Sequence, residues 1–411
     1  MVKPGYKQTE IGIIPEDWET SKLGDIGQFK NGINKDKDKF GYGVPIIGLM
    51  DVFGVNHINS TANSGLVDAS PYEQEDYSLK EGDVLFVRSS VKPAGVGLTA
   101  VVEQTLQNAV FSGFLLRYRT EKLTVGFKRY AFYASYFREN LIAASTVSAN
   151  TNINQDSLKQ LVLAYPTDEA EQNKIAQAIS HIDALILNLE EQLSKKKAIK
   201  QGAMQKLLTG KKRLPEFSGE WESIALGKVS SFYNGGTPSK KREDWWTGNI
   251  PWISSSDLSE SSITSVKISR FISQDAVEHS ATRICPKNAV LIVSRVGVGK
   301  VAVSPCELCT SQDFTAVVSS RHNPYFLAYM LMPLMKDLAI QAQGTSIKGV
   351  TTEDIQKIAI PTPTIDEQNA IVNILANMDS EIEALEQKLA KYRQVKQGMM
   401  QQLLTGKIRL V

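Results

Sequence analysis

A long internal repeat constrains this chain more than any other feature of its sequence. Residues 200–214, KQGAMQKLLTGKKRL, return as residues 396–410, KQGMMQQLLTGKIRL, at an offset of about 196 residues. Upstream and in the same register, the pattern Glu-Gln-Asn-x-Ile at 171–175 returns at 367–371. The period is too long for a solenoid and fits two copies of a whole domain with its connector. A protein built twice commonly meets a target or partner that also has two parts.

The composition of the chain says little about its function and more about the compartment in which it works. The 411 residues carry a net charge of +2, so the overall charge neither demands nor excludes a polyanionic partner. Three cysteines do not make a secreted disulfide scaffold and favour a reducing compartment. The first residues lack the apolar core of a signal peptide, and no stretch approaches the roughly 18 apolar residues of a membrane span. We expect a soluble, cytoplasmic protein without membrane contact.

The repeated connectors have the pattern of long helices. Apolar residues recur at a 3-4 spacing, which places a seam along one side of a helix. The two seams occupy matching positions in the repeat: Ile179, Ile182, Ile186, Leu189 and Leu193 in the first, and Leu375, Met378, Ile382, Leu385 and Leu389 in the second. Matching period and register predict that the two helices pair as an antiparallel coiled coil. The alternative is two unrelated amphipathic helices, each packed on its own domain.

The ends of these helices carry start and stop signals. Asp168 with Glu171, and Thr364 with Glu367, fit the capping box at a helix start. A glycine follows each leucine pair, at 210 and 406, where a C-terminal stop is expected. Each helix is then about 40 residues, or roughly 60 Å long at 1.5 Å per residue.

The segments before each helix are weakly alike. Trp18-Glu-x-x-x-Leu-Gly24 matches the segment from Trp221, and both copies carry an Asn-Gly turn, at Asn31 and Asn234. Each copy then has a β-type run, residues 83–88 and 289–294, and a helical stretch, near 128–144 and 325–342. The predicted fold class is α+β, with two mixed α/β globules, two long helices and approximate two-fold symmetry. The expected parts are residues 1–165, 166–214, 215–362 and 363–411.

The duplicated order resembles the specificity subunit of type I restriction-modification systems. The matching features are the Glu-Gln-Asn-x-Ile helix starts after Pro166 and Pro363, the paired helix ends, the Asn-Gly-Gly-Thr-Pro segment at 234–238 and the Gly-Thr-Ser turn at 344–346. The first globule departs from that pattern, with Asn31-Gly-Ile-Asn34. The resemblance spans the whole chain.

The resemblance implies a definite arrangement and function. Two target-recognition domains would each read one half of a bipartite double-stranded DNA site. The helix pair would set the spacer between the halves. It would also dock two methyltransferase subunits, which in turn recruit restriction subunits. The chain itself would have no catalytic activity.

Motifs for chemistry are weak in this sequence. The nearest candidates for an adenine-methyltransferase loop, at 323–325 and 70–72, lack its second proline. No acidic cluster with nuclease spacing is evident, and residues 295–300 lack the full phosphate-binding loop and fit a β-turn between two strands. Cys306 and Cys309, with Cys285 and His279, lack a second closely spaced zinc-ligand pair, so buried free thiols are the alternative. We expect no enzyme activity, no metal and no cofactor.

Candidates for DNA contact gather in turns. Arginine and lysine contact phosphates, and arginine, asparagine and glutamine read base edges. The candidates are Lys35, Lys37, Lys39, Arg88 and Lys92 in the first half, and Lys240, Lys241, Arg242, Arg295, Lys300, Thr345, Ser346 and Lys348 in the second. Each could instead be an ordinary solvated side chain. The alternative function is a coiled-coil adaptor that bridges proteins without reading DNA; salt-dependent binding of a bipartite site separates the two.

Overall fold

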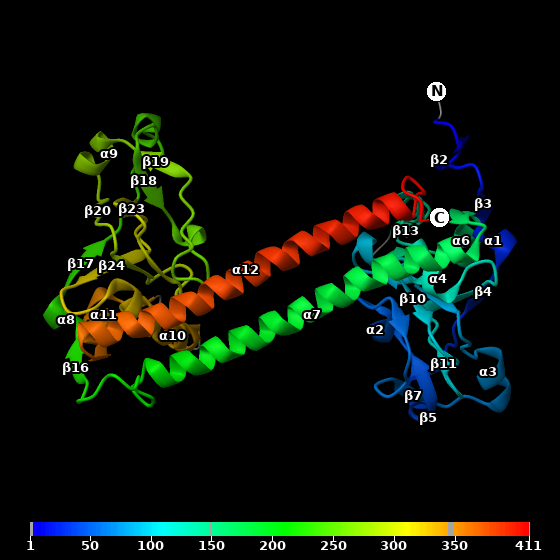
Figure 1. The fold of residues 1–411 in the computed structure, drawn as a ribbon, viewed down its shortest axis with the longest axis horizontal. Coiled ribbons are helices and arrows are strands. Elements are labelled where there is room, and N and C mark those ends of the chain that lie inside the picture. Colours follow the sequence, from blue (N-terminus) through cyan, green and yellow to red (C-terminus); the bar gives the residue numbers. More distant parts are fainter. Residues whose placement is uncertain (1–2, 148–149, 344–348, 411) are drawn as a thin grey trace. The chain divides into compact units, whose positions relative to one another are not determined.

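The structure, a computed structural model, describes residues 3–147, 150–343 and 349–410. The chain divides into two compact units, unit 1 with Met1–Glu190 and Lys388–Val411, and unit 2 with Glu191–Gln387. Each unit holds one mixed α/β globule and parts of two 39-residue helices, α7 (Glu169–Leu207) and α12 (Ile365–Leu403) (Figure 1). The predicted α+β class with two long helices is therefore confirmed. Each unit is described below by itself.

Unit 1 is built on a five-stranded sheet with the order β4-β12-β8-β10-β6, next to the three-stranded sheet β11-β5-β7. Its strands are β1 Tyr6–Thr9, β2 Gly12–Pro15, β3 Trp18–Lys22, β4 Gln28–Asn31, β5 Phe40–Ile47, β6 His57–Ile58, β7 Gly65–Val67, β8 Val84–Val87, β9 Ser89–Ser90, β10 Thr99–Val102, β11 Val110–Phe111, β12 Leu115–Arg119, β13 Thr146–Val147, β14 Thr151–Asn152 and β15 Val162–Pro166. Its shorter helices are α1 Leu23–Ile26, α2 Leu49–Val52, η1 Lys37–Lys39, α3 Pro71–Asp76, η2 Pro93–Gly95, α4 Val125–Ala131, α5 Ser135–Ala143 and α6 Gln155–Gln160.

Unit 2 has two four-stranded sheets, with the orders β17-β24-β21-β22 and β19-β18-β23-β20. Its strands are β16 Glu222–Ala225, β17 Ser230–Asn234, β18 Ile250–Ile253, β19 Arg270–Ile272, β20 Ile284–Cys285, β21 Val290–Val293, β22 Val301–Val303, β23 Leu308–Thr310, β24 Phe314–Ser319 and β25 Ala359–Thr362. Its shorter helices are α8 Leu226–Val229, η3 Glu243–Trp246, η4 Ser255–Asp257, α9 Gln274–His279, α10 Pro324–Gln343 and α11 Thr352–Lys357.

The two globules share one sheet plan. The order β4-β12-β8-β10 in unit 1 corresponds to β17-β24-β21-β22 in unit 2, and all of these neighbours pair antiparallel. The central strands β8 and β21 fall inside the predicted runs, and every residue of both is buried, as expected for strands covered on two faces. The sequence pattern therefore locates the middle of each globule correctly.

One predicted helix is divided in two. The stretch near 128–144 forms α4 and α5, because the chain turns between them and Ala134 adopts an extended conformation (φ −56°, ψ 137°). The turn buries the ring of Phe132, whose centroid lies 5.0 Å from that of Phe86 and 5.6 Å from that of Phe137. Tertiary aromatic packing here outweighs local helix propensity.

The long helices start and stop near the predicted signals. Asp168 Oδ1 accepts a hydrogen bond from the Ala170 amide at 2.9 Å, and Thr364 Oγ1 accepts one from the Glu367 amide at 3.4 Å. Gly210 and Gly406 take the left-handed conformation, with φ of 68° and 67°, as expected after a helix end. The glutamates of the two predicted capping boxes, Glu171 and Glu367, bind side chains from distant parts of the sequence.

Those glutamates join each helix to its globule. In unit 1, Glu171 is 2% exposed and accepts hydrogen bonds from Trp18 Nε1 at 3.2 Å and from the Arg409 guanidinium at 2.5 and 2.7 Å. In unit 2, Glu367 is 1% exposed and accepts from Trp221 Nε1 at 3.1 Å and from Arg213 at 2.5 and 2.7 Å. Buried carboxylates need such charged partners. The two equivalent sets explain why the repeat retains tryptophan, glutamate and arginine.

The next residue of the motif completes this joint. The Gln172 side chain donates to the Pro166 carbonyl at 2.9 Å and accepts from the Thr124 amide at 2.7 Å. Gln368 donates to the Pro363 carbonyl at 3.0 Å and accepts from the amide of Asn323 at 2.8 Å. Both glutamines are buried, so these bonds satisfy amide groups that would otherwise be costly.

Within unit 1, segments of α7 and α12 run antiparallel. The ion pairs Glu190–Arg393 and Asp183–Lys396 both close at 2.6 Å, so partners rise in number on α12 as they fall on α7. In unit 2, the pairs Lys197–Glu386 at 2.6 Å and Lys200–Asp379 follow the same rule. All ten predicted seam residues are buried or half-buried: Ile179, Ile182, Ile186, Leu189, Leu193, Leu375, Met378, Ile382, Leu385 and Leu389.

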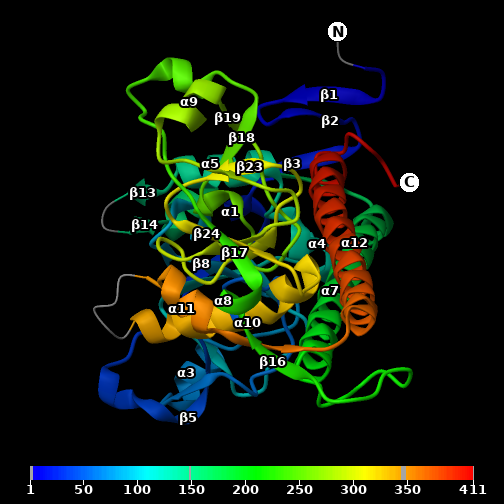
Figure 2. The same cartoon turned by 90° about the vertical axis from the view of Figure 1, so that its left-hand side faces the viewer.

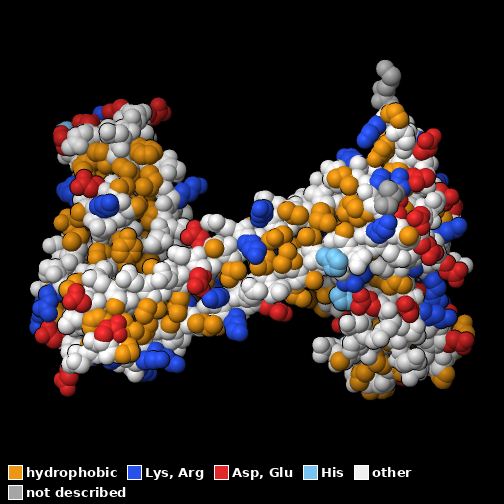
Figure 3. All heavy atoms as spheres, in the orientation of Figure 1, with side chains coloured by type: hydrophobic (Ala, Val, Ile, Leu, Met, Phe, Trp, Pro, Cys, Tyr) orange, Lys and Arg blue, Asp and Glu red, His pale blue; other side chains and the backbone are white. Residues whose placement is uncertain are grey.

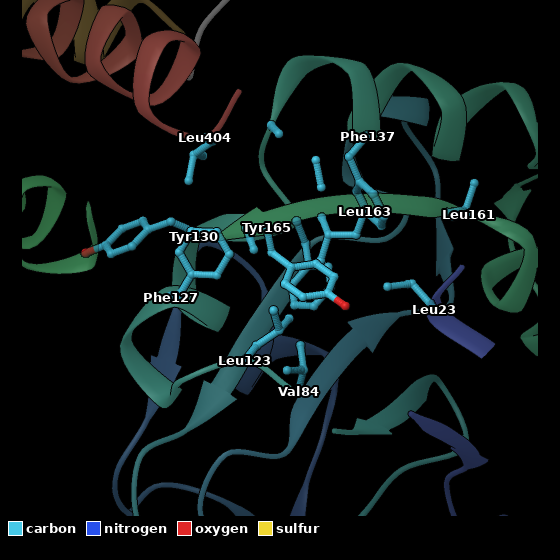
Figure 4. Packing of buried hydrophobic residues seen from close by; sticks show 14 of the residues in the cluster. Leu23, Val84, Leu123, Phe127, Tyr130, Phe137, Leu161, Leu163, Tyr165 and Leu404 are labelled. Carbon is cyan, nitrogen blue, oxygen red and sulfur yellow. The ribbon is translucent and has the colours of Figure 1, made fainter. Parts of the chain in front are cut away.

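The C-terminal end of α12 contributes to the core of unit 1. Leu404 points from the chain just past α12 toward Tyr130 and Phe127 (Figure 4), and all three residues belong to one buried cluster. The β1–β2 hairpin lies beside this end of α12 (Figure 2), where Tyr6 Oη donates to the Gly406 carbonyl at 3.2 Å. Leu208 has the equivalent place in the core of unit 2.

Candidate nucleic-acid interface

Four segments of unit 1 come together as a surface, which we call the loop face of unit 1. Backbone hydrogen bonds join them: Ile33 N donates to Phe111 O at 2.8 Å, Arg88 N to Phe114 O at 3.0 Å, and Ile153 N to Arg88 O at 3.0 Å. Strand β14 also pairs with β9. The loop face of unit 1 comprises residues 31–34, 88–92, 112–114 and 150–154.

Unit 2 repeats this framework. Gly236 N donates to Thr310 O at 2.8 Å, Ser294 N to Asp313 O at 2.8 Å, and Val350 N to Ser294 O at 2.7 Å. These bonds match those of unit 1 one for one. The loop face of unit 2 therefore comprises residues 234–237, 294–299, 311–313 and 349–352.

The repeated Asn-Gly turn has a physical reason in both units. A Cβ atom on Gly32 would lie 2.0 Å from the Ser112 carbonyl oxygen, and one on Gly235 would lie 2.0 Å from the Ser311 carbonyl oxygen. No side chain fits so close an approach of two backbones. The glycines hold the first and third segments of each loop face together.

The side chains on the two loop faces differ. The loop face of unit 1 holds five asparagines, three serines, Arg88 and Lys92, and no aspartate or glutamate. Phe114, which is 62% exposed, occupies the position of Asp313 in unit 2. Asparagine and arginine are the side chains that pair with purine edges, and an acid-free surface tolerates nearby phosphates. A common backbone thus displays two different sets of recognition groups.

The lysines predicted in the first half divide between paired and exposed positions. Lys35 Nζ lies 2.7 Å from a Glu73 carboxylate oxygen and lowers the pKa of that group to about 2. Lys39 Nζ lies 3.5 Å from Asp68, whereas Lys37 and Lys92 are exposed. Arg88 is half-buried, and its guanidinium donates to the Gly113 carbonyl at 3.5 Å. Of these candidates, only Arg88 and Lys92 lie on the loop face.

In the second half, too, some candidates for DNA contact have partners within the fold and others are exposed. Arg242 binds Asp244 at 2.9 and 2.6 Å, and hydrogen bonding to that carboxylate raises the arginine pKa. Lys240 and Lys241 are exposed beside it, and Arg295 is exposed in the turn between β21 and β22, which confirms the predicted strand-turn-strand. Lys300 turns inward, donating to the carbonyls of Ser255 and Leu258 at 3.2 Å each. Thr345, Ser346 and Lys348 lie outside the described residues.

Sequence reasoning missed several residues of the loop faces, above all Phe114, Asn34 and Asn152. Their grouping depends on contacts between residues about 26 to 80 positions apart in the sequence, which no local pattern reveals. The Ser-Gly-Phe turn at 112–114 was the available signal, since it interrupts a β-type run with small residues.

Each unit has a cleft between its globule and its helix segments. The cleft of unit 1 has a volume of about 660 Å³, and that of unit 2 about 520 Å³. Five lining residues are identical at equivalent positions of the repeat, namely Asp183, Ile186, Glu190, Lys396 and Met400 in unit 1, and Asp379, Ile382, Glu386, Lys200 and Met204 in unit 2. The two clefts therefore share a helical wall, while their other walls come from unlike globules.

The helices also expose apolar side chains to solvent. Figure 3 shows hydrophobic side chains along the helix surface, and Leu187, Ile199 and Val395 are 57%, 48% and 37% exposed. Among the described residues, no three His, Cys, Asp or Glu side chains cluster as a metal site would require. The cysteines are free thiols, with Cys285 and Cys309 buried. None of the described helices combines the length and apolar character needed to cross a membrane.

Comparison with known proteins identifies the family. The chain matches the family described as type I restriction modification DNA specificity domain twice, over residues 15–201 and 218–392. It belongs to this family. A protein of Methanocaldococcus jannaschii, provisionally named the MjaX specificity subunit of a type I restriction enzyme, is 26% identical over 98% of this chain and 97% of that protein. The Escherichia coli EcoR124I/EcoR124II specificity subunit is 29% identical over 236 residues, 56% of each chain.

A solved structure has the same fold. The S subunit of a type I restriction-modification system from M. genitalium aligns with a TM-score of 0.59 and 14% identity, covering 94% of this chain and 96% of that one. The family match over two domains agrees with the two equivalent frameworks described above. The chain thus contains two domains of the type I restriction modification DNA specificity family and has the fold of that solved S subunit.

Proposed function

We propose that each loop face reads one half of a bipartite double-stranded DNA site. The observation that carries this is one backbone framework, built twice, with unlike side chains at equivalent positions such as Phe114 and Asp313. A target with two identical halves would need no such difference. In this proposal the recognition domains are residues 1–165 and 215–362, and the helical parts are 166–214 and 363–411.

The candidate side chains take two roles in the proposal. Arg88, Lys92 and Arg295 contact the DNA from the loop faces, and Lys37, Lys240 and Lys241 add phosphate contacts at the flanks. Lys35, Lys39, Arg242 and Lys300 already have partners in the fold, so we assign them mainly to holding loops in place. Thr345, Ser346 and Lys348, which lie outside the described residues, stay candidates for DNA contact on the strength of the sequence alone.

The helix pair would act as a ruler for the spacer between half-sites. Two continuous 39-residue helices support this role, since each contributes to both units. Inserting one heptad into each helix, at matching positions of the repeat, adds about 10 Å at 1.5 Å per residue. The expected result is a recognised spacer about three base pairs longer, with both half-sites unchanged, since B-DNA rises 3.4 Å per base pair. Sequencing of protected or methylated sites measures it, and an unchanged spacer contradicts the ruler.

We further propose that two methyltransferase subunits dock on this chain, one on each unit. The equivalent helical walls of the two clefts and the exposed apolar side chains of α7 and α12 support a partner that is met twice. Restriction subunits would join through the methyltransferase subunits. Catalysis would then reside in the partners, and this chain would supply recognition without a metal or cofactor of its own, inside the cytoplasm.

Binding to defined duplexes tests the proposal. The chain, assembled with its methyltransferase subunits, should protect one bipartite site, and its affinity should fall steeply between 50 and 200 mM salt as phosphate contacts are screened. A control duplex with one half-site scrambled should bind at least about 1,000-fold more weakly, at the lower end of specific-to-nonspecific ratios. Equal binding to all duplexes would contradict sequence reading and favour a coiled-coil adaptor.

A further inference from the structure

One aromatic side chain on the loop face of unit 1, that of Phe114, is mostly exposed to solvent. Phe114 is 62% exposed at the tip of the turn between β11 and β12, although the phenylalanines of the nearby core, such as Phe86 and Phe111, are fully buried. Its backbone is held in place, because its carbonyl accepts the Arg88 amide at 3.0 Å and its amide donates to Ser112 Oγ at 3.3 Å. A fixed turn therefore presents an apolar ring to solvent.

The other residues of the loop face of unit 1 are mostly polar and include no aspartate or glutamate. The Asn34 side chain lies against Gly113, since a Cβ on that glycine would be 1.9 Å from Asn34 Oδ1. Arg88 donates to the Gly113 carbonyl, and Asn152 lies on the strand that pairs with Ser89. These groups match hydrogen-bonding base edges in the major groove. The thymine C5-methyl is the apolar group that those edges offer.

We infer that Phe114 reads thymine methyl groups in the half-site bound by unit 1, as a specificity-determining contact. This rests on the DNA-reading function proposed above. The equivalent position in unit 2 holds Asp313, whose carboxylate would not match a methyl group. The contact is thus a property of one half-site only, and it helps to explain how two copies of one framework distinguish unlike sequences.

Replacing thymine by uracil removes only the methyl group and so isolates the contact. The half read by unit 1 is first identified by exchanging residues 18–158 and seeing which half changes. Each thymine in that half is then replaced by uracil, one duplex at a time, and affinity is measured for the wild-type complex and for Phe114→Ala. Losing the burial of one methyl group weakens binding about fourfold.

The wild type should show this loss at one or two positions, and Phe114→Ala should show none at those positions. Phe114→Leu, which remains apolar, should retain part of the loss. Phe271→Ala is the matched control, since Phe271 is an exposed phenylalanine of unit 2 (41% exposed) and should leave the uracil effect in this half unchanged. Circular dichroism of each variant verifies the fold.

A uracil effect that persists undiminished in Phe114→Ala overturns the inference, and so does the absence of any uracil-sensitive position in a half that contains thymine. A half-site of unit 1 without any thymine overturns it as well. If the wild-type complex protects no bipartite duplex at all, the proposed function itself has failed and the inference falls with it. These outcomes therefore distinguish failure of the thymine contact from failure of the proposed DNA-reading function.

Discussion

The two globules have the same arrangement of strands and loops, but different side chains occupy the equivalent positions. In unit 1, Asp83 is fully buried and binds the Arg119 guanidinium at 2.6 and 2.7 Å, and the nearby Lys128 ammonium, 4% exposed, donates to the carbonyls of Gly82 and Thr120. In unit 2, the equivalent positions of these three charged residues hold Ala289, Val318 and Leu327.

The contacts that join each globule to the start of a long helix, which we call the helix joints, are the same in both units. Glu171 and Glu367, with their tryptophan and arginine partners, match atom for atom between the units. Burial of Tyr130 raises its pKa to about 12, so it stays a hydrogen-bond donor to Asp183 at 3.0 Å, and Tyr329 donates to Asp379 at 2.6 Å in the same way. The contacts that hold a globule to the helices are therefore kept, while those inside the globules and on the loop faces vary.

The largest effect on stability should come from breaking the charged network that only unit 1 possesses. Asp83→Ala removes the stronger of the two carboxylate charges that act on the buried Lys128 ammonium, the other being Glu121, and also removes the partner of Arg119. It should lower the free energy of unfolding of unit 1 by about 3–5 kcal/mol. Urea denaturation measures it. Asp156→Ala, which removes a solvent-exposed partner of Lys159, is the control and should cost less than about 1 kcal/mol.

A stricter test replaces the three charged residues of unit 1 by the residues found at the equivalent positions of unit 2. The triple change Asp83→Ala, Arg119→Val and Lys128→Leu removes all three charges together, and should recover most of the loss, because apolar replacements of buried ion pairs are often neutral. A triple variant as unstable as Asp83→Ala alone would contradict the equivalence of the two frames.

A loss of stability of similar size is expected at the helix joints, and it should be equal in the two units. Arg213→Ala should destabilise unit 2, and Arg409→Ala unit 1, each by about 3 kcal/mol, since each leaves a buried glutamate with only its tryptophan donor. Tryptophan fluorescence during denaturation reports both joints. Arg393→Ala, which breaks an exposed pair with Glu190, is the control and should have little effect. Losses that differ greatly between the two arginines would show that the joints are not equivalent.

A difference that depends on pH should also separate the units. Burial lowers the pKa of His322 to about 4, and its ring makes 2.8 Å hydrogen bonds with Ser319 and Thr362. The unfolded chain therefore binds a proton more readily than the folded one between pH 6.5 and 4. Unit 2 should lose up to roughly 3 kcal/mol of stability as pH falls through that window.

Unit 1 has Leu123 at the position equivalent to His322, so the change His322→Leu tests the pH effect. The variant should flatten the dependence of unit 2 on pH between 6.5 and 4, as measured by denaturation at several pH values. An unchanged slope would mean that another group titrates.

Much of this fold could be predicted because its signals are local. The seams and the glycine stops of α7 and α12 lie in one continuous stretch each, and repetition confirmed their register. The partners of Glu171 could not be predicted, because Arg409 is 238 residues away and outcompetes the local helix amide. Likewise, Lys35 and Lys240 look alike in sequence, but only Lys35 meets a carboxylate in the fold. The loop faces depend on strand pairing over long separations, so their membership emerges only from the structure.

The central claim is that two globules on one frame carry separate halves of the information. Exchanging residues 18–158 for the corresponding globule of another specificity subunit tests it most directly, with the recognised sites mapped by sequencing of methylated DNA. The expected result is a new sequence in one half-site, with the other half and the spacer unchanged. A change in both halves, or in neither, would contradict the account.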